Sequence, residues 1–113
     1  MAGQLKLLAG PAYVASSATN ILAAPSTGYL TVRHIHLANV TASSATVSLY
    51  LGATGGSAGG TELFKTFTIA ANSSYDYWCA MVMSTTAFLS GICETGASKV
   101  TVIVEGEASI SSA

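Results

Sequence analysis

The 113-residue chain is predicted to be all-β, a single antiparallel β-sandwich or jelly-roll-like domain of about seven or eight strands with an extended N-terminal arm. Three observations predict this class. Alternation of apolar and polar residues with a period of two recurs along the chain, whereas helical periodicity is weak. The β-branched and aromatic residues gather in short runs separated by Gly, Ser, Asn and Pro. These runs recur about every ten residues, which is typical of a sandwich or small barrel rather than of a βαβ fold.

The domain boundaries follow from where these runs begin and end. Residues 1–18 are predicted to be an N-terminal arm, because the strand pattern begins near Asn20 and the segment is small and apolar with a single charge, Lys6. Residues 19–107 are predicted to form the sandwich, and residues 108–113 a C-terminal tail. Deletion of residues 1–18 is therefore expected to leave the sandwich folded.

The first two predicted strands flank a proline-containing turn. A strand over residues 21–24 ends at Pro-Ser-Thr-Gly, residues 25–28, which combine a fixed φ with a residue that tolerates positive φ. The second strand begins near Tyr29 and ends at Asn39. Strict alternation gives it one face with Leu30, Val32, His34 and His36, and another with Arg33, Ile35 and Leu37. Both faces carry apolar residues, which suits a strand covered on both sides.

Later strands are predicted at residues 46–51, 63–69, 75–83 and 100–105, and a short Phe88-Leu89 segment is expected to lead through Gly91 to Ile92 and Cys93. The residues expected to face the core from the first and last of these are Val47, Leu49, Leu51, Val102 and Val104. Ser48 is assigned to the opposite face, where an aspartate should be tolerated. The segment GATGGSAGG at residues 52–60 is expected to be a loop, because its five glycines and lack of charge leave the backbone free to move or to approach a neighbour closely.

The chain carries few charges. Four basic and five acidic residues give a net charge of -1, which excludes a polybasic nucleic-acid binder and gives no attraction to anionic membranes. Gly and Pro residues interrupt the uncharged stretch at residues 7–32, so no transmembrane helix is predicted. Surface scaling gives a folded monomer of this mass roughly 5,800 Å² of surface, or about 600 Å² per charge, which is sparse for a free soluble monomer. We therefore expect a homo-oligomer or a permanent complex.

His34 and His36 are the candidate metal ligands of the sequence. One residue apart on a strand, they project from the same face and can present two imidazoles to an ion. No Asp, Glu or Cys lies near them in sequence, so core or interface histidines bonded to the backbone are the favoured interpretation, and a pH-sensitive contact is an alternative. No metal site is predicted. An enzymatic function stays open only if the two histidines meet a carboxylate across the sheet.

Other chemistry is missing from the sequence. The glycine-rich segment lacks the Lys-Ser/Thr of a P-loop, and neither G-x-S-x-G nor a nucleophile paired with a base is present. We therefore expect a non-enzymatic protein without a cofactor. Cys79 and Cys93 have no CxxC or Cys/His spacing, so buried thiols are favoured over a disulfide or a zinc site.

Aromatic and apolar side chains supply the candidate interface. Tyr75, Tyr77 and Trp78 form a cluster whose amphipathic rings suit a sheet edge or core, a protein contact or a sugar platform. The arm adds further apolar residues. The candidate interface residues are Leu5, Leu7, Leu8, Tyr13, Val14, Tyr75, Tyr77 and Trp78.

Three stretches of the chain together point to a family. They are TNILAAPSTGYLTVRHIHLANVTASSATVSLYLG, ELFKTFTIAANSSYDYW and SKVTVIVEGE, which lie within residues 19–107. In them a proline-containing turn, an Ala-Asn strand end, an IAANSS turn before an aromatic strand and a valine-rich last strand follow one another. In this order of motifs the chain resembles small β-sandwich structural proteins of tailed bacteriophages, of the capsid decoration or minor tail type.

The resemblance implies a function. It implies a non-enzymatic accessory protein on the exterior of a virion assembled in the host cytoplasm, with head and tail locations equally open. Its partners would be capsid or tail proteins and copies of itself, with a trimer as the expected oligomer and no binding to nucleic acid or membrane. The N-terminal arm could attach by adding a strand to a neighbour's sheet edge. The alternative is a receptor- or carbohydrate-binding module that uses Tyr75, Tyr77 and Trp78 as a stacking platform.

Overall fold

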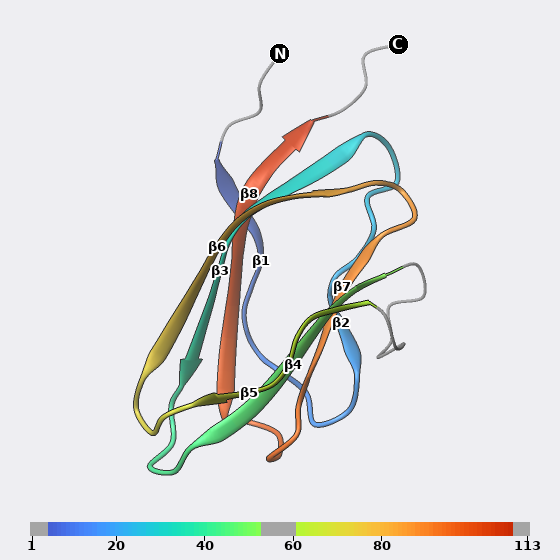
Figure 1. Cartoon of the computed structure of the whole chain (residues 1–113). Coiled ribbons are helices and arrows are strands. Elements are labelled where there is room, and N and C mark those ends of the chain that lie inside the picture. Colours follow the sequence, from blue (N-terminus) through green and yellow to red (C-terminus); the bar gives the residue numbers. More distant parts are fainter. Residues whose placement is uncertain (1–4, 53–60, 110–113) are drawn as a thin grey trace.

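The computed structural model describes residues 5–52 and 61–109 and folds them into a β-sandwich (Figure 1). One four-stranded sheet, called here the first sheet, has the order β1 (Lys6–Tyr13), β8 (Val100–Ser109), β3 (Tyr29–Asn39), β6 (Ser74–Met83). The second sheet, also four-stranded, has the order β2 (Thr19–Leu22), β7 (Phe88–Cys93), β4 (Ala45–Gly52), β5 (Glu62–Ile69). All pairings are antiparallel. The predicted all-β sandwich is thus confirmed. No helix long and apolar enough to cross a bilayer occurs in these residues.

The core lies between the two sheets. Ile35 and Leu37 of β3 and Leu89 of β7 are fully buried there. The predicted core residues Val47, Leu49, Val102 and Val104 are all buried, and Leu51 packs against this core while remaining partly accessible. Burial of a Val or Leu side chain contributes about 1.5–3 kcal/mol to the free energy of unfolding relative to leaving it exposed. The inward-facing residues of β3, β4 and β8 therefore stabilise the sandwich.

A β-bulge in β3 corrects the predicted faces of this strand. Val32 pairs with Gly106 and His34 with Glu105, so β3 has one residue more than β8 between these pairs. The extra residue, Arg33, reverses the alternation, because successive side chains point to opposite faces. Val32 therefore points into the core, as Ile35 and Leu37 also do, whereas His34 and His36 lie on the outer face. The prediction that Val32 shares a face with His34 is wrong.

The N-terminal segment also differs from the prediction. Residues 6–13 form β1, which pairs with β8 from Lys6 opposite Gly106 to Tyr13 opposite Thr101. The next residue, Val14, is 1% exposed, and its N–H donates to the carbonyl of Val100 at 2.8 Å. The expected arm is therefore part of the sandwich over residues 6–14.

The last strand, β8, extends beyond the predicted end of the sandwich at residue 107. Residues 108 and 109 extend β8 instead of beginning a tail. Residues 1–4, 53–60 and 110–113 lie outside the described residues, and with them the predicted loop beyond Gly52 and the rest of the predicted tail.

Ser48 on β4 does not lie on an open face. It is fully buried, and its hydroxyl donates to Glu94 Oε2 at 2.5 Å and accepts from the N–H of Thr66 at 2.8 Å. Thr66 sits where β5 has one residue more than β4, and its φ is 50°. Ser48 thus replaces a missing backbone acceptor at this bulge, and the expectation of a tolerant outward face is corrected.

Asn39 gives a structural reason for the Ala-Asn strand end. Its buried amide donates to the carbonyls of Ser43 and Ile69, at 2.8 and 3.0 Å, and its oxygen accepts from the N–H of Thr41 at 3.0 Å. A single side chain therefore ties the end of β3 to the turn before β4 and to the end of β5. Buried polar groups are stable when they are hydrogen-bonded in this way.

Candidate functional site

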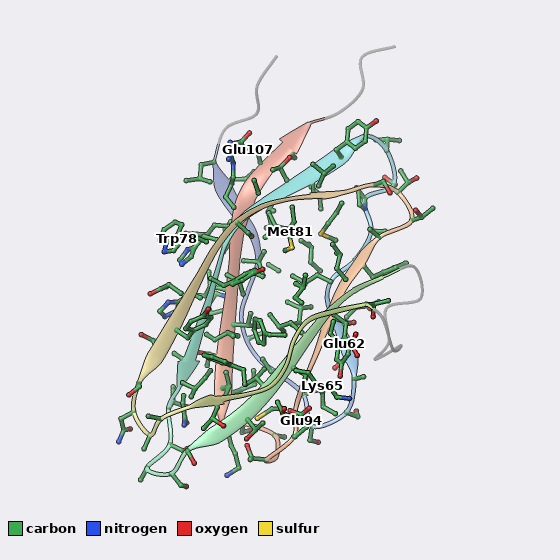
Figure 2. The ribbon with its side chains drawn as sticks, viewed as in Figure 1. Glu62, Lys65, Trp78, Met81, Glu94 and Glu107 are labelled. Atoms are coloured by element: carbon green, nitrogen blue, oxygen red, sulfur yellow. The ribbon has the colours of Figure 1, made fainter. Side chains whose placement is uncertain are left out.

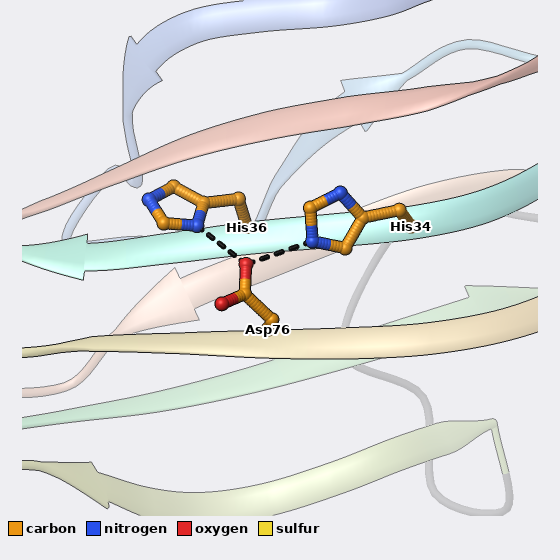
Figure 3. Close-up of side chains that lie close together, drawn as sticks. All are labelled: His34, His36 and Asp76. Atoms are coloured by element: carbon orange, nitrogen blue, oxygen red, sulfur yellow. Dashed lines mark hydrogen bonds and ion pairs between the residues drawn. The ribbon is translucent and has the colours of Figure 1, made fainter. Parts of the chain in front are cut away.

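The outer face of the first sheet carries a cluster of two histidines and a carboxylate. His34 and His36 project from β3 towards Asp76 of β6 (Figure 3). Asp76 Oδ1 lies 2.8 Å from His34 Nε2 and 2.6 Å from His36 Nδ1. One ligand atom from each of the three residues lies within 4.8 Å of the others. Among the described residues, these three are the His, Cys, Asp or Glu side chains whose ligand atoms lie close enough together to hold a metal ion.

Strand pairing explains how these residues meet. His36 is directly opposite Asp76, and His34 is opposite Trp78. Because residues two apart on a strand share a face, Asp76 lies diagonally beside His34 as well. The bulge at Arg33 is also required, because it turns both imidazoles outward while Val32 and Ile35 remain in the core.

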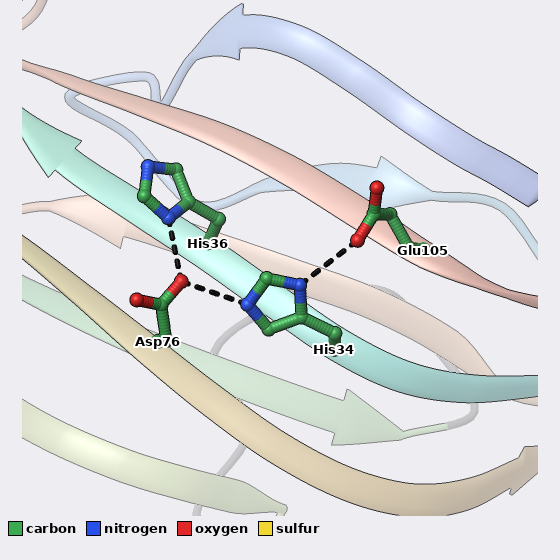
Figure 4. Close-up of polar contacts among 4 residues, drawn as sticks. All are labelled: His34, His36, Asp76 and Glu105. Carbon is green, nitrogen blue, oxygen red and sulfur yellow. Dashed lines mark hydrogen bonds and ion pairs between the residues drawn. The ribbon is translucent and has the colours of Figure 1, made fainter.

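A second carboxylate approaches His34 from the other side. Glu105 of β8 is opposite His34, and its Oε1 lies 2.9 Å from His34 Nδ1 (Figure 4). Both ring nitrogens of His34 therefore face carboxylates from the two neighbouring strands. The side chain of His34 is 12% exposed, while those of Asp76 and Glu105 are 44% and 43% exposed, so the cluster is open to solvent at its acidic edges.

The two carboxylates change the protonation of the cluster. Burial lowers the pKa of His34, but hydrogen bonds and charge interactions with Glu105 and Asp76 outweigh it and raise the pKa above its ordinary 6.5. Hydrogen bonds from His36 and then from His34 lower the pKa of Asp76 below its ordinary 3.8. The cluster therefore favours a cation, either a proton on His34 or an ion between the ligands.

Trp78 covers one side of this cluster. Its indole stacks on the imidazole of His34, with 3.9 Å between ring centroids and 12° between planes. It is nevertheless 72% exposed, and Figure 2 shows it outside the first sheet, whereas Met81 of the same strand lies between the sheets. Tyr75 and Tyr77 point inward and pack edge-on against Phe64 of β5. Alternation thus splits the predicted aromatic cluster into an exposed ring and two partly buried ones.

The remaining candidate interface residues differ in how far they are exposed to solvent. Leu5, Leu7 and Tyr13 are each more than half exposed, Leu8 packs against the core, and Val14 is buried. Val14 is therefore corrected from an interface residue to a core residue. The exposed ones lie on β1 or just before it, at the edge of the first sheet.

Both cysteines are free, and the favoured buried position holds for Cys93 alone. Cys93 is buried, whereas Cys79 is half-buried and places its Sγ 3.4 Å from the carbonyl oxygen of Val32. Burial raises the pKa of the Cys79 thiol, although a hydrogen bond with the backbone of Met81 acts in the opposite direction. Neither thiol belongs to the histidine cluster.

Sequence reasoning found the two histidines and missed both carboxylates. Asp76 is 40 residues from His36, and Glu105 is 71 residues from His34, so only the strand register brings them together. The available signal was alternation in β6, which turns Asp76 outward when Tyr75 and Tyr77 turn inward. The histidines thus meet the condition under which an enzymatic function stayed open, a carboxylate across the sheet.

Comparison with known proteins gives no further guide to this cluster. No family model, no curated protein and no solved structure matches the chain, so its function is inferred from its own residues.

Proposed function

We propose that the protein is a non-enzymatic structural component of a tailed-phage virion, an accessory protein on the particle exterior that assembles through the edges of its first sheet. Its partners are copies of itself and other virion proteins of the capsid or the tail. It joins the virion during assembly in the host cytoplasm. The sequence resemblance and the low charge support this proposal.

The distribution of exposed apolar side chains carries the proposal. In the described ranges, the large apolar side chains that are more than half exposed all belong to the first sheet or to residues next to its strands: Leu5, Leu7, Tyr13, Tyr29, Val40, Trp78 and Val82. Four of them lie on its edge strands, β1 and β6. Edge strands with exposed apolar residues favour pairing with, or burial against, another chain.

Sedimentation velocity at micromolar concentration tests self-assembly. We expect the wild-type chain to sediment as an oligomer, with a trimer as the expected form. Tyr13→Lys on β1 and Val82→Lys on β6 should each dissociate this oligomer, because each places a charge on an apolar sheet edge. Thr68→Lys is the matched control, since Thr68 is exposed on the second sheet. A wild-type chain that sediments as a monomer would contradict self-assembly.

A density map of the whole phage particle tests the virion assignment. We expect the chain on the outside of the head or tail, with edge residues of the first sheet buried against a neighbour. Purified particles that lack the chain would contradict the assignment.

Carbohydrate or receptor binding is the second candidate, and the exposure of Trp78 favours it. An exposed indole beside Asp76 and His36 offers a stacking surface next to hydrogen-bonding groups. In a glycan-binding assay this function predicts specific binding that Trp78→Ala abolishes while oligomerisation persists. Absence of binding by the wild-type chain would remove this candidate.

A further inference from the structure

We propose that His34, His36 and Asp76 bind a zinc ion on the outer face of the first sheet, and that Glu105 orients His34 for this role. This inference concerns the polar side chains of β3, β6 and β8, and its test measures metal binding instead of the edge contacts proposed above.

The three ligand atoms lie within 4.8 Å of one another, so shifts of no more than about 1.5 Å bring them to the separations that zinc requires. Zinc bound through imidazole nitrogen and carboxylate oxygen, at about 2.0–2.2 Å, holds neighbouring ligand atoms about 3.3–3.6 Å apart in a tetrahedron. Asp76 Oδ1 is 2.8 Å from one imidazole nitrogen and 2.6 Å from the other. A rotation of the Asp76 side chain, which is 44% exposed, opens these distances by less than about 1 Å.

Glu105 selects the form of His34 that binds a metal. Its oxygen lies 2.9 Å from Nδ1, so the carboxylate holds a proton on Nδ1, and Nε2, which lies 2.8 Å from Asp76 Oδ1, is the nitrogen that releases its proton when an ion binds. Metal-binding histidines almost always donate their other N–H to a carboxylate, a backbone carbonyl or water, which fixes the tautomer and the ring orientation. Trp78 stacks on the same ring at 3.9 Å and limits its rotation further.

The donor set indicates the class of ion. Two imidazoles and one carboxylate suit zinc and neighbouring transition metals, whereas calcium and magnesium prefer oxygen ligands throughout. The carboxylates of Asp76 and Glu105 supply negative charge at the site. The guanidinium of Arg33, the nearest basic group along β3, is paired with Glu107 at 3.1 Å. Three protein ligands leave one position of a tetrahedral ion for water.

Calorimetric titration of the EDTA-treated full chain with zinc chloride tests the proposal. We expect one zinc ion per protomer. His36→Gln removes a ligand and should weaken binding at least tenfold, and Glu105→Gln should weaken it about 10–100-fold, the range for lost outer hydrogen bonds. Glu62→Gln on β5 is the matched control, because it removes the same charge from the second sheet, outside the cluster, and its affinity should equal that of the wild type.

Trp78 provides an independent readout, because it is the one tryptophan of the chain. Paramagnetic cobalt bound between His34, His36 and Asp76 should quench its fluorescence, and zinc should reverse the quenching by displacement. The cobalt spectrum should lack a thiolate charge-transfer band, since Cys79 and Cys93 lie outside the site. Asp76→Asn should abolish the quenching, and because Asp76 is on the outer face, this variant keeps the core intact.

Three results would overturn the proposal. They are no zinc binding by the wild-type chain, equal affinity in the wild type and His36→Gln, and a thiolate band in the cobalt spectrum. Circular dichroism in EDTA establishes that each variant is folded. If His36→Gln does not fold, the comparison of Asp76→Asn with the wild type decides.

Discussion

At the scale of single residues, His34 couples the stability of the sandwich to pH. Its pKa in the folded protein lies above the ordinary 6.5, because Glu105 of β8 and Asp76 of β6 both favour its protonated form against the effect of burial. The folded chain therefore holds this proton more tightly than the unfolded chain does. The resulting stabilisation is fully present below pH 6.5 and is lost as the pH rises through the folded pKa.

Urea unfolding in EDTA across this pH range measures the effect. We expect the free energy of unfolding to fall with rising pH above 6.5 in the wild type, and to fall less in Glu105→Gln. Asp76 acts with the opposite sign at acid pH, because its lowered pKa gives stability that is lost as the pH falls below 3.8. A wild-type free energy that rises between neutral and mildly alkaline pH would contradict the assignment.

Ser48 allows a second prediction at this scale. Ser48→Ala removes the acceptor for the N–H of Thr66 and the donor to Glu94, so it should destabilise the protein by about 1–3 kcal/mol. Ser48→Asp should also be destabilising, since it places a carboxylate against Glu94. Thermal melts measure both, with Thr68→Ala on the exposed face of β5 as the control. If Ser48→Ala melts with the control, the buried hydroxyl has no structural role.

At the scale of elements, the sequence predicted the strands that alternate and missed the one that does not. The strand at residues 29–39 has the predicted bounds. β1 was missed because KLLAGPAY contains Gly and Pro and its pairing with β8 shifts register twice, so no period of two is visible. The bulge at Arg33 left no local signal, because it depends on the strands beside β3. Asp76 and Glu105 were missed for the same reason, because only strand pairing brings them beside the two predicted histidines.

The N-terminal strand gives the prediction at this scale. Deletion of residues 1–14 should lower the melting temperature strongly and promote aggregation, because it uncovers the edge of β8 and removes the buried side chain of Val14, worth about 1.5–3 kcal/mol. Deletion of residues 1–5 leaves β1 whole and is the control. Equal melting temperatures for the two deletions would show that β1 does not stabilise the sandwich.

At the scale of the whole molecule, the surface area agrees with the expectation from size. The chain exposes 5796 Å², close to the roughly 5,800 Å² that surface scaling gives. The sparse charges on this surface are unevenly placed. His34 and Glu105 lie on the inner strands of the first sheet, whereas Asp76 lies on its edge strand β6 together with the exposed Trp78 and Val82. The polar cluster and the exposed apolar residues therefore meet on β6.

The topology also predicts how fast the chain folds. The first sheet pairs β1 with β8, so its completion joins the two ends of the described chain. Such non-local pairing slows folding, and we expect refolding in milliseconds to seconds rather than microseconds. Stopped-flow fluorescence of Trp78 after dilution from urea measures the rate. A microsecond phase that restores the full native signal would contradict this expectation.

The adjacency of β1 and β8 also makes the sandwich a directional scaffold for protein engineering. Lys6 lies opposite Gly106, so the chain enters and leaves the first sheet at one pole, while Asn39 and Val100 pair at the other pole beside the turn before β4. A domain fused directly before Lys6 or directly after Ser109 therefore emerges from the same pole. A linker that joins Ser109 to Lys6 would permit circular permutation, with new ends opened in the turn between β5 and β6 at the opposite pole.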